Sequence, residues 1–203
     1  SLLGATGSIG VQTLNIIKNN PKHFRLIACA AGYNIPKVRE IVHVFQPRIV
    51  SVAQKEDAEK LTREFSQTRF VYGNEGLRIV AAESGEDIVL NAVIGSVGLF
   101  PTLEEIRACI TIAIANKETL VAAGDIVMNE AKKYEVPILP VDSEHSALFQ
   151  ALNGEDDKMI DRLILTASGG SFRDKTREQL VGVSVEEALD HPNWSMGSKL
   201  NID

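Results

Sequence analysis

Short runs of apolar residues alternate with amphipathic runs along most of this chain, and this alternation constrains the fold more than any other feature. Each apolar run is continuous, which is typical of strands buried on both faces of a parallel sheet. The amphipathic runs between them indicate helices, so the order predicts repeated β–α–β units and an α/β fold with a doubly wound parallel sheet. The predicted strands are residues 24–31, 49–52, 88–94, 111–115, 138–141 and 163–167, and the predicted helices are residues 9–19, 37–45, 55–65, 102–107, 120–134 and 146–152.

One of these helix starts carries a capping pattern. Thr102 follows Pro101, and an acid, Glu105, stands three positions further on. A threonine N-cap with an acidic residue at the third helical position satisfies two backbone N–H groups reciprocally. We therefore predict that Thr102 caps this helix.

Composition supports a buried sheet and excludes two classes of partner. Aromatic residues make up only 5% of a chain that is 44% hydrophobic, so Val, Ile, Leu and Ala must fill the core. The formal net charge of −6 argues against a nucleic-acid partner. No apolar run approaches the roughly 20 residues of a membrane span. The only cysteines, Cys29 and Cys109, lie in apolar stretches, which predicts small buried side chains in a reducing compartment.

The alternating pattern weakens after residue 141. Residues 153–161 are polar, and loop-forming residues accumulate from Asp190 onwards. We predict a nucleotide-binding domain over residues 1–141 and the start of an α/β catalytic domain over residues 142–203. The chain stops at Asp203 without a further turn or helix, so we expect it to be part of a longer protein.

Glycines at every third position mark the first turn of the chain. Gly4, Gly7 and Gly10 lie between a short apolar segment and the first predicted helix. Glycine is needed where a strand turns sharply into a helix and the backbone approaches a pyrophosphate, and the N–H groups at the helix start then bind the phosphates. This predicts a Rossmann-type dinucleotide site, and the alternative is a glycine-rich turn that binds nothing.

The end of the second predicted strand favours NADP over NAD. NAD sites usually place an acid there, which bonds the ribose 2′-hydroxyl. Here the strand runs into Gly32, Tyr33 and Asn34 without any carboxylate that would repel a 2′-phosphate. We therefore predict NADP, with Asn34 and the loop amides available to the phosphate.

Polar residues follow three further predicted strands, and ligands bind at such carboxyl ends. Asn116, Lys117 and Glu118 follow residues 111–115, where Lys117 can reach a substrate while its neighbours position the nicotinamide ribose. The alternative there is a capped helix start with a solvated lysine. The segment from Ser168 to Ser171 follows residues 163–167 and indicates an anion-binding nest for a phosphate or carboxylate.

Carboxylates follow the strand predicted at residues 138–141. Asp142 and Glu144 point the same way if the strand pitch continues, which predicts a site for Mg²⁺ or Mn²⁺ rather than Zn²⁺. Two protein ligands are too few to bind a metal ion tightly, so a third ligand must come from elsewhere in the protein. His145 could be a ligand, but the residues that follow it look helical, so we interpret it as a packed or capping residue. The only tryptophan, Trp194, lies in a loop that forms either a lid over the site or an ordinary anchored turn.

These motifs, in this order, resemble one enzyme family. The segments GATGSIG, AGYN, ANKET, PVDSEHSA, LTASGGSFRD and HPNWSMG are similar to those of the 1-deoxy-D-xylulose 5-phosphate reductoisomerases, over the whole chain. The resemblance implies rearrangement and NADPH-dependent reduction of that phosphorylated sugar to 2-C-methyl-D-erythritol 4-phosphate, in non-mevalonate isoprenoid biosynthesis. It also implies Mg²⁺ or Mn²⁺, with Co²⁺ as a further option, a homodimer, and a location in the bacterial cytosol or the plastid stroma.

The resemblance also implies roles for individual residues. The pyrophosphate contacts would be Thr6, Gly7, Ser8 and Ile9, and the 2′-phosphate contacts Gly32, Tyr33 and Asn34. The nicotinamide-end contacts would be Asn116, Glu118 and Gly197, and the metal ligands Asp142 and Glu144. The catalytic and substrate contacts would be Lys117, Ser143, Glu144, Ser168, His191 and Trp194.

The chain departs from the family pattern in two respects. Tyr33 stands where members often carry a basic or small residue. A serine, an Asn-Lys phosphate clamp and a third carboxylate ligand, which the family has further on, are not in this sequence. We therefore expect the chain alone to bind NADPH weakly and to turn over nothing. The alternatives are another NADP-dependent dehydrogenase of the Rossmann type, and a nucleotide-binding module without catalysis.

Overall fold

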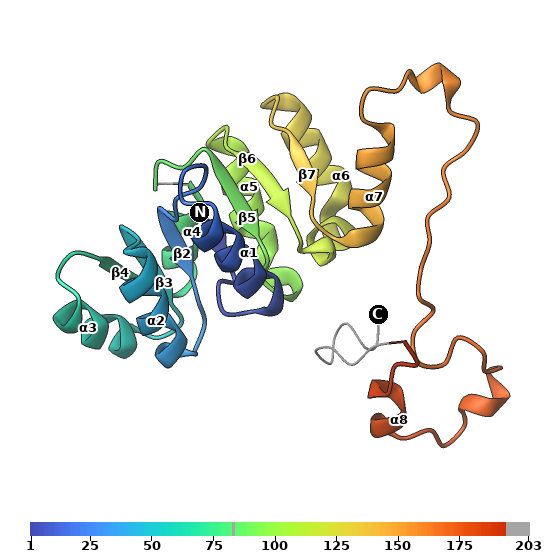
Figure 1. Ribbon diagram of the computed structural model, residues 1–203, viewed down its shortest axis with the longest axis horizontal. Helices are drawn as coiled ribbons and strands as arrows, with labels where there is room; N and C mark the ends of the chain where they lie inside the picture. Colours follow the sequence, from blue (N-terminus) through green and yellow to red (C-terminus); the bar gives the residue numbers. More distant parts are fainter. Residues whose placement is uncertain (83, 194–203) are drawn as a thin grey trace. The chain divides into compact units, whose positions relative to one another are not determined.

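The computed structural model of the chain describes residues 1–82 and 84–193 (Figure 1). The chain divides into two compact units, Ser1–Ser146 and Ala147–Asp203. The predicted domain boundary after residue 141 lies just before this division, and the assignment of residues 142–203 to a catalytic domain stays a prediction. Among the described residues, no helix combines the length and the apolar character needed to cross a membrane.

The first unit is built on a seven-stranded sheet in which every neighbouring pair of strands is parallel. The strand order is β4-β3-β2-β1-β5-β6-β7, so the direction of winding reverses between β1 and β5. This confirms the predicted α/β fold with a doubly wound parallel sheet. The strands are β1 (Leu2–Leu3), β2 (Ala28–Ala30), β3 (Ile49–Val52), β4 (Arg69–Tyr72), β5 (Ile88–Asn91), β6 (Thr111–Ile114) and β7 (Ile138–Pro140).

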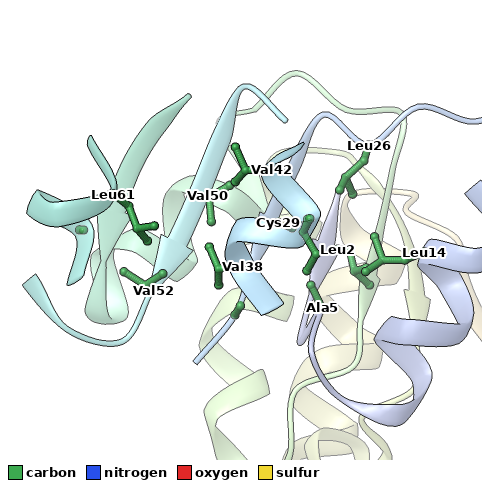
Figure 2. Packing of buried hydrophobic residues seen from close by; sticks show 13 residues of the cluster. Leu2, Ala5, Leu14, Leu26, Cys29, Val38, Val42, Val50, Val52 and Leu61 are labelled. Carbon is green, nitrogen blue, oxygen red and sulfur yellow. The ribbon is translucent and has the colours of Figure 1, made fainter. Parts of the chain in front are cut away.

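Helices cover both faces of this sheet. On one face, α1 (Ser8–Asn19), α2 (Ile35–Phe45) and α3 (Lys55–Glu64) contribute apolar side chains to a core with β1, β2 and β3. In Figure 2, Val38 and Val42 of α2 lie beside Val50 of β3. Val, Leu, Ile and Ala dominate this core, as the low aromatic content predicts.

The opposite face carries α4 (Gly73–Ala82), α5 (Leu99–Arg107) and α6 (Lys117–Lys133). α4 packs over β1, β2 and β3, and α5 and α6 pack together beside β6. A short 3₁₀ helix, η1 (Gly95–Gly98), leads directly into α5. α6 contains a kink at Ala123, whose φ of −147° and ψ of 32° are not helical. Both-face coverage explains why the central strands read as continuous apolar runs.

The pair β4 and α4 was not expected from the sequence. β4 is an edge strand in which only Val71 is buried, so it lacks the continuous apolar run of the central strands. α4 begins with Gly73 and contains Gly76, and glycine is a poor helix former. Gly76 is nevertheless needed, because a Cβ there would lie 2.4 Å from Ser51 Oγ.

Several helices begin earlier than predicted, and the first residues of α6 and α7 are polar and so do not reveal helical periodicity. α5 begins at Leu99, so the predicted capping role of Thr102 is wrong. Thr102 is fully buried inside α5, and its hydroxyl donates to the Gly98 carbonyl at 2.8 Å. Glu105 is also fully buried. α6 begins three residues earlier than predicted, at Lys117, and α7 (Ser143–Leu152) three residues earlier, at Ser143.

The cysteines differ in environment. Cys29 is buried in β2, and desolvation raises the pKa of its thiol to about 12. Cys109 is exposed, so the expectation that it is buried is wrong. It follows α5 with a φ of +57°, a left-handed conformation that turns the chain towards β6.

The second unit begins inside α7 and contains the 3₁₀ helices η2 (Asp157–Met159) and η3 (Glu178–Leu180) and the short helix α8 (Val185–Leu189). The strand predicted at residues 163–167 is wrong, because residues 160–170 form no regular secondary structure. Leu163, Ile164 and Leu165 are each more than half exposed. An apolar run becomes a strand only where a neighbouring strand accepts its backbone hydrogen bonds, and none of the described strands pairs with this one.

Candidate active site

The glycine turn joins β1 to α1 at the carboxyl edge of the sheet. Gly4 has a φ of +83°, and a Cβ on it would lie 2.4 Å from the Ala92 carbonyl oxygen. A Cβ on Gly10 would lie 2.3 Å from the Gly4 carbonyl oxygen. Neither position tolerates a side chain, so the turn has the tight geometry that the sequence predicted.

The start of α1 is suited to an anion. Gly7 is the N-cap residue, and no side chain caps the helix or places an acid in its first turn. The N–H groups of Ser8 and Ile9 open the helix, where no intrahelical carbonyl is available to them. The turn lies beside β5, at the point where the strand order reverses, which is where open α/β sheets bind dinucleotides.

The end of β2 forms the second part of the site. Gly32, Tyr33 and Asn34 are all exposed, and Tyr33 is 75% exposed. Asn34 is the N-cap of α2, because its Oδ1 accepts from the Lys37 N–H at 3.2 Å. Lys37 Nζ lies 2.5 Å from Glu40 Oε2 on the exposed surface of the same helix.

Lys37 is a candidate that the sequence reasoning missed. It is a cation in the first turn of α2, directly after the segment predicted to bind the 2′-phosphate. Lys37 lies three residues beyond Asn34, inside the helix rather than at the end of the strand, where a basic residue is expected. Asn34 could have indicated this role for Lys37, because asparagine is a favoured N-cap and the residue three positions after it lies in the first turn of the helix, next to the loop.

The end of β6 brings Asn116, Lys117 and Glu118 to the same edge. Asn116 is only 1% exposed and caps α6, since its Oδ1 accepts from the Thr119 N–H at 3.0 Å. Lys117 and Glu118 are half-buried in the first turn of the helix. The capped helix start that we weighed as an alternative is therefore present, and it does not exclude a role for Lys117 in substrate binding.

The predicted metal ligands follow β7. The strand ends at Pro140 and α7 begins at Ser143, so the expectation that the strand pitch continues through Asp142 and Glu144 is wrong. Asp142 Oδ1 accepts from the His145 N–H at 3.2 Å and lies 2.6 Å from His145 Nδ1. Glu144 Oε2 accepts from the Ser143 hydroxyl at 3.0 Å.

The predicted role of His145 as a packed or capping residue is wrong, because its side chain is 55% exposed and the cap at the start of α7 is the Asp142 carboxylate, which accepts from the His145 N–H. The Asp142 side chain is 17% exposed, so its carboxylate is partly shielded from water. Hard carboxylate oxygens suit Mg²⁺ or Mn²⁺. No group of three or more His, Cys, Asp and Glu side chains suited to a metal occurs within residues 1–82 and 84–193, so the metal site stays a prediction.

Ser168 and His191 meet in the second unit. His191 is 5% exposed, and its Nδ1 accepts from the Asn193 N–H at 3.1 Å. In the neutral ring the proton therefore lies on Nε2, which is 3.3 Å from Ser168 Oγ. Gly170 N–H also donates to Ser168 Oγ, at 3.2 Å. With two donors directed at its oxygen, the Ser168 hydroxyl is left to donate its own proton, for example to an anion.

Gly169 and Gly170 have φ values of +82° and +69°, which supports the predicted nest although it does not follow a strand. Trp194 and Gly197, together with the proposed lid, lie outside the described residues.

A polar cluster at the ends of β5 and β6 was not foreseen. Asn91 Nδ2 donates to Thr102 Oγ1 at 3.0 Å, and Asn116 Nδ2 donates to the carbonyl oxygens of Val93 and Gly95 at 2.7 and 2.9 Å. Asn91 interrupts the apolar run of residues 88–94, and a polar residue inside that run was the available signal that the strand ends there.

Together, the strand order, the glycine turn at the reversal point and the helix start behind it define a Rossmann-type fold, the class of domain in which dinucleotides bind at this point. Sequence models of one family match most of the chain. The 1-deoxy-D-xylulose 5-phosphate reductoisomerase model matches residues 1–124, and the model of that enzyme's C-terminal domain matches residues 138–203. The chain belongs to the 1-deoxy-D-xylulose 5-phosphate reductoisomerase family.

Curated relatives agree with this assignment. The chain is 60% identical over 203 residues to 1-deoxy-D-xylulose 5-phosphate reductoisomerase 2 of Bacillus thuringiensis subsp. konkukian (strain 97-27). It is 58% identical over 202 residues to the reductoisomerase of Listeria innocua serovar 6a. In each comparison all of this chain is covered but only 53% of the relative, so the chain spans about half the length of these relatives.

Solved structures show the same fold. A crystal structure of DOX-P reductoisomerase in complex with NADPH, fosmidomycin and magnesium matches with a TM-score of 0.87 and 39% identity, covering 100% of this chain and 53% of that chain. The 1-deoxy-D-xylulose 5-phosphate reductoisomerase from Zymomonas mobilis in complex with NADPH matches with a TM-score of 0.86 and 34% identity, covering 94% and 51%.

Proposed function

We propose that this chain supplies the NADPH-binding domain and part of the catalytic site of a reductoisomerase. The reaction isomerises 1-deoxy-D-xylulose 5-phosphate and reduces the product to 2-C-methyl-D-erythritol 4-phosphate, with consumption of one NADPH and one proton. The observation that carries the proposal is the glycine turn, whose Gly4 and Gly10 leave no room for a Cβ. Family membership and the NADPH named for two similar structures support it.

NADPH would supply the hydride. The N–H groups of Ser8 and Ile9 at the start of α1 would hold its pyrophosphate by backbone hydrogen bonds. Asn34 and Lys37 at the start of α2 would stabilise the 2′-phosphate, the first through its Nδ2, which has no hydrogen-bond partner among the described residues, and the second through its positive charge. Tyr33, which is largely exposed, leaves the phosphate accessible to solvent and so weakens this part of the site.

A divalent metal would supply Lewis-acid stabilisation of negative charge on the substrate oxygens. Asp142 and Glu144 would hold it, with Mg²⁺ favoured by the magnesium in a similar structure. His145 orients the Asp142 carboxylate through its N–H and Nδ1. Lys117, at the start of α6, and the Ser143 hydroxyl would contact the substrate beside these carboxylates.

The substrate phosphate would bind at Ser168. The Nε2–H group of His191 and the Gly170 N–H both donate to Ser168 Oγ, which directs the hydroxyl proton away from them. A hydroxyl oriented in this way donates to an anionic oxygen. The fosmidomycin named for two similar structures supports a phosphorylated sugar as the substrate.

The test is NADPH oxidation by the protein at its natural length, with 1-deoxy-D-xylulose 5-phosphate and with or without Mg²⁺ or Mn²⁺. We expect metal-dependent oxidation that falls at least about 100-fold in Asp142→Asn. Asp125→Asn, an exposed change on α6, is the matched control and should retain full activity. Absence of oxidation by a folded protein that binds NADPH would remove the proposal and favour another NADP-dependent dehydrogenase.

A second proposal concerns the 203-residue chain by itself, for which we infer NADPH binding without turnover. The described residues offer only two carboxylates at the metal position, which supports this. Measurable turnover by the chain alone would refute it.

We also propose that the protein forms a homodimer, which analytical sedimentation of the protein at its natural length would test. We further propose a bacterial cytosolic location, since the relatives reported above are bacterial.

A further inference from the structure

The loop between β5 and α5 shares the dinucleotide crevice with the glycine turn. The two backbones touch, because the Cβ position of Gly4 lies 2.4 Å from the Ala92 carbonyl oxygen and 3.1 Å from Val93 N. This loop, residues 92–98, carries Ile94 and Val97, whose side chains are 73% and 53% exposed. It therefore lies at the reversal point between β1 and β5, where a dinucleotide would be bound.

Asn116 fixes the shape of this loop. Its side chain is buried, and its Nδ2 donates to the carbonyl oxygens of Val93 at 2.7 Å and Gly95 at 2.9 Å. Its Oδ1 accepts from the N–H and the hydroxyl of Thr119. Its backbone N–H donates to the Asn91 carbonyl at 3.2 Å. Every hydrogen-bonding group of the Asn116 side chain is thus used inside the protein.

The other end of the loop is fixed from β5. Asn91 Nδ2 and the Thr102 hydroxyl both donate to the Gly98 carbonyl, at 3.4 and 2.8 Å. Asn91 Oδ1 accepts from the Val93 N–H at 3.4 Å. Gly98 packs directly on Asn116, since a Cβ there would lie 2.8 Å from Asn116 Cγ. Two buried asparagines therefore hold four backbone groups of one short loop.

We propose that Asn116 is a positioning residue for NADPH, which acts by holding residues 93–98 as a wall of the dinucleotide site rather than by a side-chain contact with the cofactor. This inference rests on the proposed function. It differs from the role that the family resemblance implies, because the amide has no donor left to offer a ligand. This wall exposes Ile94 and Val97 to the dinucleotide site, and their apolar surface suits packing against the flat face of a ring of the cofactor.

The decisive variant is Asn116→Asp. Aspartate keeps the N-cap acceptor for Thr119 and adds a favourable charge at the helix start, so α6 is not weakened. It replaces the two donors by an oxygen that faces the Val93 and Gly95 carbonyls at 2.7 and 2.9 Å, and this repulsion displaces the loop. The matched control is Asn20→Asp, an exposed amide that donates to the Ile16 carbonyl at 2.9 Å.

NADPH binding is measured by its fluorescence, and amide hydrogen exchange reports the loop in the absence of NADPH. We expect Asn116→Asp to raise the Kd for NADPH about tenfold, equivalent to about 1.4 kcal/mol, and to accelerate exchange at residues 93–98. At natural length the KM for NADPH should rise similarly, while kcat at saturating NADPH changes less than about threefold. Asn20→Asp should change none of these.

The outcomes separate the two proposals. If the wild-type protein does not bind NADPH, the proposed function fails. If it binds and Asn116→Asp binds equally well, the inference is overturned. Weaker binding with unchanged loop exchange would also overturn it, because that result indicates direct contact. If Asn116→Asp does not fold, Asn116→Ser, which keeps a capping oxygen but lacks the two donors, takes its place with the same expected results.

Discussion

Glu105 is a buried acid that should destabilise the fold at neutral pH. It lies on α5 with no exposed surface, and both of its carboxylate oxygens lack a hydrogen-bond partner among the described residues. Burial raises the pKa of this carboxyl well above its ordinary value of 4.5, and repulsion from Glu86 raises it further. A group whose folded pKa is raised lowers stability once the unfolded chain ionises first.

The perturbation is Glu105→Met, which keeps the length of the side chain and the helix propensity. An unsatisfied buried polar group costs about 1–3 kcal/mol, so we expect a gain of about 2 kcal/mol at pH 8. For a chain of this size that corresponds to a rise in Tm of about 4–8 °C. Below pH 4.5 both states are protonated, so the ionisation part of the gain should disappear on acidification.

Urea unfolding followed by circular dichroism at about pH 4 and pH 8, on either side of the ordinary carboxyl pKa of 4.5, measures this difference. The matched control is Glu104→Met on the same helix, where the acid is 33% exposed and pairs with Arg107 at 3.1 Å. That change should give no gain at either pH, since surface ion pairs contribute about 0–1 kcal/mol. A loss of stability in Glu105→Met, or a gain that does not grow with pH, would refute the reasoning.

Three further outcomes are expected. Glu135, exposed after α6 with a φ of +54°, should accept glycine with a gain of about 1 kcal/mol in the free energy of unfolding, measured in urea. Gly4→Ala should abolish NADPH binding and cost at least about 3 kcal/mol, because its Cβ would lie 2.4 Å from the Ala92 carbonyl oxygen; thermal unfolding and a fluorescence titration check this. A thiol reagent at pH 8 should modify Cys109 in the folded chain and reach Cys29 only in denaturant, because burial raises the Cys29 thiol pKa to about 12. Equal reactivity of both thiols would show that β2 opens readily.

The central strands were predictable because burial on both faces leaves a continuous apolar run, as in residues 49–52. The same signal failed at residues 163–167, because an apolar run does not reveal whether a neighbouring strand exists. It also failed at β4, an edge strand in which only Val71 is buried. Pairing and edge position are properties of the whole sheet, so a local pattern does not contain them.

The site was predictable where glycine was required and less so where asparagine was involved. Gly4 must be glycine whatever surrounds it, since its φ is +83°. Asn116 was correctly placed at the end of β6, but its partners, Val93 and Gly95, are 23 and 21 residues away in the sequence. The polar group that an amide contacts depends on tertiary packing, which short motifs do not encode.

The glycine turn has a consequence for mutational tolerance. The groups proposed to hold the pyrophosphate are backbone N–H groups, which every residue except proline possesses. Exchange of the Ser8 side chain should therefore be tolerated, although we propose that the phosphates bind at this residue. Gly10 should tolerate nothing, because a Cβ there would lie 2.3 Å from the Gly4 carbonyl oxygen. A saturation scan of the glycine turn should thus find its most sensitive positions at glycines whose role is steric rather than contact with the cofactor. An inhibitor that binds the backbone N–H groups at the start of α1 would leave the protein few substitutions that confer resistance.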